Sequence, residues 1–168
     1  QKHFTPYVGA GGSNVCVDHD DAGVDVDVSK AKVSHNNLGG VGPDKGDESV
    51  RISGMGSLST DGSAPVGFDV IVTALSPYSA PNGGEKNGIN GNFGAISIGY
   101  GTFTRFRASF VNSETDAPVT IPSVSMGFLD MDHGGEGDCT EVVRIIRDTD
   151  TFDGYWTNSG HGTPTYDW

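Results

Sequence analysis

Glycine is the feature that most limits what this chain can fold into. The 168 residues include 26 glycines, many of them in Asn-Gly and Gly-Gly pairs. A glycine inside a helix costs about 1 kcal/mol relative to alanine. Nor do apolar residues anywhere keep the 3.6-residue period of an amphipathic helix. Helical and Rossmann-type folds are therefore disfavoured, and we expect short strands joined by glycine-rich turns.

The strand signals are short and spread along the chain. Residues 24–28 (VDVDV) alternate apolar and polar side chains at period two, as a half-buried strand does. This pattern predicts an all-β fold, an antiparallel β-sandwich of jelly-roll type with long Gly/Asn-rich loops. Further strands are expected at residues 49–53, 66–75, 93–98, 102–111, 124–130 and 141–147.

The length fits one β-sandwich domain over residues 1–168. Within it, residues 1–23 are expected to form an N-terminal arm, residues 24–147 the core and residues 148–168 a C-terminal tail. We interpret Gln1 as the end left by processing of a secreted precursor. The tail offers no clear closing strand, so the chain is expected to continue beyond Trp168.

Two stretches without strand patterns, residues 34–48 and 76–94, stand out for their length. The second contains the Asn-Gly steps at Asn82, Asn87 and Asn90, which are turn signals because Asn and Gly both tolerate positive φ. Loops this long in a compact domain are usually functional or held by contacts. Tolerated surface insertion is the alternative.

The charge balance restricts the partners. The chain carries 22 acidic and 10 basic residues, a net charge of −12. This balance argues against nucleic-acid binding, which needs clustered Lys and Arg, and against docking on anionic membranes. No apolar run approaches the roughly 20 residues that cross a bilayer, so no membrane insertion is expected. A chain this acidic is better suited to binding calcium or to keeping a highly hydrated surface.

An acidic segment near the C-terminal end is the candidate metal site. It runs from a predicted strand through Gly134 and Gly135 into the next strand, so the chain can turn there. Calcium takes six to eight oxygen ligands, and the spacing is not that of an EF-hand. A solvated acidic turn and a catalytic cluster are the alternatives. The calcium ligands expected here are Asp130, Asp132, Asp138 and Glu141.

The two cysteines, Cys16 and Cys139, are 123 positions apart. In a secreted protein we expect them to form a disulfide, which the entropic model values at about 4–5 kcal/mol for a loop this long. Two buried free thiols are one alternative. A zinc site shared with His19 and His133 is another, although no CxxC or HxxxH spacing supports it.

Aromatic side chains gather in the C-terminal tail among polar residues. They suit stacking on sugar faces or contact with another protein, and a tail packed over its own core is the alternative. Thr5 and Thr163, each followed by proline, leave room for O-linked sugars and hence for a glycoprotein. The candidate contact residues are Tyr155, Trp156, Tyr166 and Trp168.

Nothing in the sequence selects an enzyme. The five histidines are scattered through probable loops, and neither a Gly-x-Ser-x-Gly elbow nor a phosphate-binding glycine motif occurs. We therefore name no catalytic residue and expect no cofactor other than calcium.

Residues 36–143 resemble an uncharacterised family of secreted β-sandwich proteins at the cell surface of marine algae and other protists. The resemblance lies mainly in residues 88–94 (GINGNFG) and in the strand ending in Asp130-Met131-Asp132. It implies a β-sandwich fold and an extracellular location, and it implies no activity.

Together these observations predict a non-enzymatic extracellular structural protein, a calcium-stabilised subunit of a cell surface, matrix or filament. Its partners would be copies of itself, other surface proteins or glycans. The alternative is a carbohydrate-binding module that uses the C-terminal aromatics, and the third interpretation is a polysaccharide-active enzyme.

Overall fold

The computed structural model describes residues 23–59, 64–91 and 93–121. All of them belong to one unit of the chain, Gln1–Val124. The strands expected at residues 124–130 and 141–147, the C-terminal tail and nearly all of the N-terminal arm lie outside the described residues. The single domain over residues 1–168 therefore stays a prediction.

The regular structure of the described residues consists mainly of antiparallel strands, which confirms the all-β prediction for this part of the chain. Its helices are three short 3-10 turns, and none in the described ranges reaches seven residues. No helix there is long and apolar enough to cross a membrane. In chain order the elements are β1 (Val24–Val26), η1 (Val28–Lys30), β2 (Lys32–Asn36), η2 (Leu38–Gly40), β3 (Ser49–Leu58), β4 (Val66–Ala74), η3 (Pro81–Gly84), β5 (Gly88–Asn90), β6 (Phe93–Ala95) and β7 (Phe106–Asn112).

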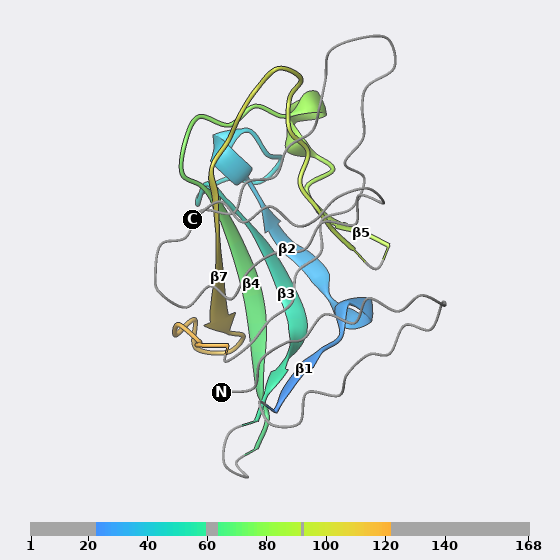
Figure 1. Ribbon diagram of the computed structural model, residues 1–168, viewed down its shortest axis with the longest axis vertical. Helices are drawn as coiled ribbons and strands as arrows, with labels where there is room; N and C mark the ends of the chain where they lie inside the picture. The colour runs from blue at the N-terminus through green and yellow to red at the C-terminus, as the bar shows by residue number, and fades with distance from the viewer. Residues whose placement is uncertain (1–22, 60–63, 92, 122–168) are drawn as a thin grey trace, which may run out of the picture. The chain divides into compact units, whose positions relative to one another are not determined.

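One curved sheet dominates the fold, with strand order β1-β3-β4-β7 (Figure 1). Strand β2 also pairs with β3, so β1 and β2 follow one another along the same edge of that longer strand. Strand β4 pairs with the other edge of β3, and β7 pairs with β4 over its full length. A separate two-stranded hairpin consists of β5 and β6.

A bulge in β3 explains how two strands share one edge. The register between β3 and β4 breaks between Ile52 and Gly56, and Gly54 lies there at φ +71°. Glycine adopts this left-handed conformation at little steric cost, and a bulge bends the strand that contains it. A Cβ at Gly56 would lie 2.1 Å from the carbonyl oxygen of Asp25 in β1. The close approach of β1 therefore requires glycine.

The two faces of the sheet differ in chemistry because side chains alternate along each strand. Val50 and Ile52 of β3 point to one face and form the core cluster with Leu38 of η2. Val72, Tyr78, Ile89 and Phe106 are among the partly buried side chains that pack against this cluster. The opposite face carries the charged side chains of Arg51 and Asp69.

The predicted strand positions are largely confirmed, with corrected ends, but the strand expected at residues 102–111 begins only at Phe106. The first strand stops at Val26 because the side chain of Asp27 accepts a hydrogen bond from the Ser29 amide and caps η1. Strand β3 continues five residues past the predicted end at Ser53, through the bulge. Strand β6 stops at Ala95, since the Ser97 amide donates to the side chain of Asn87 instead of a sheet partner.

Two strands were not expected. Strand β2 overlaps the start of the stretch 34–48, and β5 lies within the stretch 76–94. Both are short and contain few apolar residues, so they lack a clear alternating pattern. Each is formed by pairing with a neighbour, β2 with β3 and β5 with β6.

Candidate functional site

The residues expected to carry function lie outside the described part of the chain. Within the described ranges, no group of three or more His, Cys, Asp or Glu side chains is arranged to hold a metal ion. The expected calcium site, disulfide and aromatic contacts therefore stay predictions. They are Asp130, Asp132, Asp138 and Glu141, then Cys16 and Cys139, then Tyr155, Trp156, Tyr166 and Trp168.

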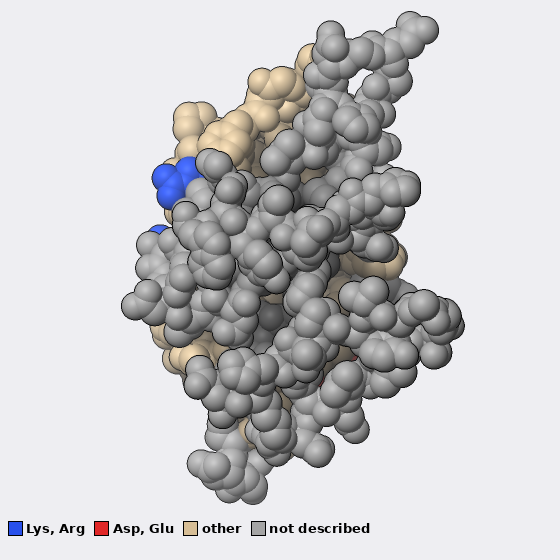
Figure 2. Space-filling view, viewed as in Figure 1, with Lys and Arg blue, Asp and Glu red and all other residues tan. Residues whose placement is uncertain are grey.

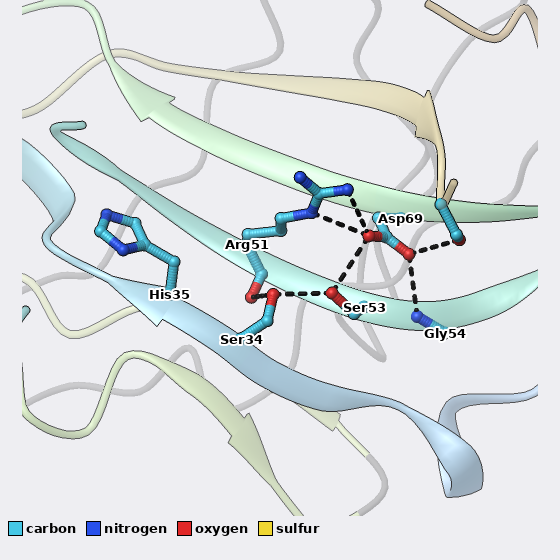
Figure 3. Close-up of a pocket in the computed structure, with 7 residues that line it drawn as sticks. Ser34, His35, Arg51, Ser53, Gly54 and Asp69 are labelled. Carbon is cyan, nitrogen blue, oxygen red and sulfur yellow. Dashed lines mark hydrogen bonds and ion pairs between the residues drawn. The ribbon is translucent and has the colours of Figure 1, made fainter. Parts of the chain in front are cut away.

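A polar pocket of about 510 Å³ lies on the charged face of the sheet (Figure 3). Strands β2, β3 and β4 and the turn after β7 supply its lining. Its chemistry depends on which of these polar groups are already bonded to one another. The lining residues are Ser34, His35, Arg51, Ser53, Gly54, Asp69 and Ser113.

The carboxylate of Asp69 is the centre of this pocket, and the residue is only 2% exposed. Its Oδ2 accepts hydrogen bonds from Arg51 Nε at 2.8 Å and from the Ser53 hydroxyl at 3.0 Å. Its Oδ1 accepts from the Gly54 amide at 3.0 Å and from the Ser113 hydroxyl at 2.6 Å. One carboxylate thus links β3, β4 and the turn after β7 (Figure 3).

Burial and bonding act on the pKa of Asp69 in opposite directions. Burial raises the pKa, since it penalises the charged form, but hydrogen bonds from Ser113, Gly54, Arg51 and Ser53 favour the carboxylate and together prevail. The net pKa of Asp69 lies below its ordinary value of 3.8. The group is therefore ionised at neutral pH and is not a proton donor there.

Arg51 is neutralised on both sides. Its Nη2 lies 2.7 Å from Oδ1 of Asp116 and 2.8 Å from Oδ2 of Asp69. These two carboxylates, Asp116 first and Asp69 second, raise the pKa of Arg51 above its ordinary value. Because its charge is already balanced, the guanidinium is poorly suited to binding an anionic ligand.

The serines and the histidine of the pocket do not form a catalytic pair. The Ser34 hydroxyl lies 2.6 Å from the Ser53 hydroxyl. His35 instead places Nε2 2.7 Å from the Asp47 carbonyl oxygen and Nδ1 3.8 Å from the Asp44 carboxylate. In Figure 3 its ring lies apart from both serines. A nucleophile needs its base within hydrogen-bond reach, so this pocket shows the geometry of a structural cluster.

A second polar cluster holds the two long stretches against each other. The Asn36 side-chain amide donates to the Gly84 carbonyl at 2.9 Å and to the Asn87 carbonyl at 3.3 Å. Asn87, only 3% exposed, accepts from the Ser97 amide at 2.8 Å and donates to the Tyr78 hydroxyl at 2.9 Å. Both stretches are therefore held in place by contacts.

Among the described residues, the most exposed aromatic side chains lie in the turn after β6. Tyr100 is 82% exposed and Phe103 is 70% exposed. We call residues 98–103 the aromatic turn. The Thr102 amide donates to the Gly99 carbonyl at 3.1 Å, and Gly101 supplies the positive φ of +66°.

Hydrogen bonds to residues 75–79 fix the backbone around this turn. The Gly99 amide donates to the Ser79 carbonyl at 2.7 Å, and the Thr104 hydroxyl donates to the Pro77 carbonyl at 3.0 Å. Ile98 at the start of the turn and Leu75 on the adjoining segment are also exposed. At the upper end of the view in Figure 2, where Figure 1 shows the loop after β6, the surface of the described residues is drawn tan and carries no charged side chain. The aromatic turn is thus a braced, apolar projection.

The aromatic turn lies in an unusual stretch of this acidic chain. Residues 86–113 contain no Asp or Glu and three basic residues, Lys86, Arg105 and Arg107. The stretch therefore carries +3, and the rest of the chain carries −15, since the total is −12.

Neither the polar pocket around Asp69 nor the aromatic turn was identified from the sequence. The signals were present as single charged residues in otherwise apolar strands, Arg51 in SVRIS and Asp69 in FDVIV. A buried charge needs a partner, and opposite charges on two such strands indicate a pair. For the aromatic turn, the signal was the absence of acidic residues around Tyr100 and Phe103.

No protein-family model, curated protein or solved structure matches this chain. The resemblance of residues 36–143 to secreted protist surface proteins therefore stays a prediction.

Proposed function

We propose that this protein is a non-enzymatic extracellular structural protein that assembles with copies of itself through the aromatic turn. The observation that carries the proposal is the exposure of Tyr100 and Phe103 on a turn whose backbone is fixed by hydrogen bonds. Exposed aromatic side chains are the usual anchors of protein interfaces. A rigid turn loses little conformational freedom when it binds, so less of the contact energy is spent on ordering.

Charge favours another copy of the chain as the partner. Two copies at −12 each repel one another over most of their surfaces. The stretch 86–113, at +3, is complementary to the acidic remainder of a neighbouring copy. Such a contact joins two different surfaces, so it is heterologous and builds rings or open filaments. This supports a filament or matrix subunit.

The polar pocket supports a structural role over an enzymatic one. The carboxylate of Asp69 and the guanidinium of Arg51 are bonded to neighbouring strands and to the turn after β7. His35 is bonded to the loop that contains Asp47. These groups would have to leave their partners before they could act on a substrate.

The finer fold in this proposal is a jelly-roll-like β-sandwich. Support comes from burial on both faces of the sheet. Val50 is buried on the core face, while Asp69 and Val111, which pair across β4 and β7, are buried on the opposite face. A calcium site at Asp130, a disulfide, O-linked sugars and secretion complete the proposal on the sequence alone.

Sedimentation velocity over a range of protein concentrations at low salt tests the assembly. We expect wild-type protein to associate and Phe103→Ala to weaken association at least about tenfold, a cost typical of interface anchors. Phe93→Ala is the matched control, because this phenylalanine is 59% exposed but lies on the β5–β6 hairpin. A monomeric wild type, or equal effects of the two variants, would count against the proposal.

Carbohydrate binding is the second candidate, because exposed aromatic rings on a rigid turn also stack on sugars. The exposed aliphatic side chains of Ile98 in the aromatic turn and of Leu75 on the adjoining segment favour a protein partner over a sugar. A glycan array separates the two. Binding that is lost in Phe103→Ala or Trp156→Ala, with the fold intact, would support the carbohydrate-binding module.

A further inference from the structure

Three Asn-Gly steps lie close together in the stretch 76–94, in different surroundings. Asn82 and Gly83 are exposed within η3, and Asn90 and Gly91 are exposed at the tip of the β5–β6 hairpin. Asn87 and Gly88, between them, are buried. All three steps share the Asn-Gly pair but differ in the residue before it, which is Pro81, Lys86 or Ile89, and the fold surrounds the three steps very differently.

Asn-Gly steps undergo a known type of backbone chemistry. The glycine backbone nitrogen attacks Cγ of the asparagine, the N–Cγ bond forms and the Cγ–Nδ2 bond breaks. Ammonia leaves with the amide proton of the glycine, and water then opens the succinimide ring to aspartate or isoaspartate. Glycine has no Cβ to hinder the approach of the nitrogen, and no oxidant or other reagent than water is needed.

We propose that Asn82 and Asn90 are sites of spontaneous deamidation and that the fold protects Asn87. Among the described residues, no hydrogen bond holds the side chain of Asn82 or Asn90, so each can rotate toward the following amide. A Cβ placed at Gly91 would meet no atom within 4 Å, which shows how open that turn is.

The protection of Asn87 has two sources. Its residue is 3% exposed, which limits access of the water that must assist the reaction. Its Oδ1 accepts from the Ser97 amide at 2.8 Å and from the Tyr78 hydroxyl at 3.1 Å, while its Nδ2 donates to that hydroxyl at 2.9 Å. These bonds fix the amide plane, so Cγ cannot turn toward the Gly88 nitrogen.

The chemical consequence is a slow change in charge. Each conversion replaces a neutral amide by a carboxylate, so the reaction at both exposed sites takes the chain from −12 to −14, two charges more negative. Conversion of Asn90 also places a carboxylate within the stretch 86–113, which has none. Deamidation at Asn82 and Asn90 does not depend on the proposed function.

Peptide mapping by mass spectrometry tests the proposed deamidation of Asn82 and Asn90. Folded protein is incubated at mildly alkaline pH, sampled over time and digested with trypsin, which separates Asn82 from the other two sites by cleavage after Lys86. We expect a mass gain of about one dalton, with aspartate and isoaspartate forms, at Asn82 and Asn90. Asn87 should convert at least about tenfold more slowly, and in denaturant all three sites should convert at comparable rates.

Two variants make the result specific. Asn82→Gln should abolish the mass gain of the peptide that ends at Lys86, because ring closure from glutamine is much slower. Tyr78→Phe removes a partner of the Asn87 amide and should accelerate conversion of Asn87 while circular dichroism shows a retained fold. Equal rates at Asn87 and Asn82 in folded wild-type protein would overturn the proposal, and so would unreactive Asn82 and Asn90.

Discussion

Arg51 on β3 and Asp69 on β4 form a two-point ion pair, in which Nε and Nη2 each lie 2.8 Å from Oδ2. The pair joins neighbouring strands on the face opposite the apolar core. Asp116 binds the same guanidinium from the turn after β7, at 2.7 Å. The inner carboxylate is 2% exposed and the outer one is 69% exposed, so the two should contribute very differently to stability.

Replacing Asp69 by Asn should destabilise the protein by about 3–5 kcal/mol, because it leaves a partly buried arginine short of one charge and replaces one carboxylate oxygen by a donor. The control is Asp116→Asn, which should cost no more than about 1 kcal/mol since that carboxylate is largely exposed. Urea unfolding with linear extrapolation measures both free energies. Similar costs for the two variants would show that Asp69 is not the centre of the cluster.

Acid should remove the contribution of Asp69. Its pKa in the folded protein lies below the ordinary value of 3.8, so the folded state holds the ionised form more strongly than the unfolded chain does. The contribution is therefore fully present above about pH 4 and is lost as pH falls through the folded pKa. Unfolding free energies measured between neutral and acid pH should fall less steeply for Asp69→Asn than for wild type. Parallel curves would contradict this.

The asparagine cluster should be needed to hold the two long stretches together. Asn87→Ala removes the acceptor of the Ser97 amide and the partner of the Tyr78 hydroxyl, and should cost about 1–3 kcal/mol. Asn90→Ala, at an exposed position three residues further on, should change stability by no more than about 0.5 kcal/mol. Thermal unfolding of both variants gives the comparison, and a neutral Asn87→Ala would refute the structural role of the cluster.

Calcium removal tests the acidic segment predicted from the sequence. If Asp130, Asp132, Asp138 and Glu141 bind calcium, a chelator should lower the melting temperature, because a ligand bound only to the folded state stabilises it. The double variant Asp130→Asn, Asp132→Asn should melt at the same temperature with and without chelator. A wild-type melting temperature that changes with neither chelator nor added calcium would exclude a calcium site at these residues.

Alternating side chains made much of the sheet predictable. The starts of β1, β3, β4 and β6 coincide with the expected strands, because each begins with a clear apolar and polar pattern after a turn. The continuation of β3 could not be foreseen, since Gly54 and Gly56 indicate the end of a strand when they are read locally. In the folded chain Gly54 lies in the bulge of β3, and Gly56 leaves room for the close approach of β1.

The clusters were harder to predict because they depend on long-range register. Arg51 and Asp69 are 18 positions apart in the sequence and meet only once β3 and β4 have paired with a bulge between them. Asn36 reaches Gly84 across 48 positions of sequence. Composition shows that such polar residues exist, but which ones are buried together follows from the topology.

A density map of the assembled protein, at a resolution that shows side chains, tests whether copies assemble through the aromatic turn. We expect the copies to contact one another heterologously, with Tyr100 and Phe103 of one copy buried against an acidic surface of the next. Assemblies in which the aromatic turn faces solvent or a sugar would contradict it, and so would protein that remains monomeric at every concentration.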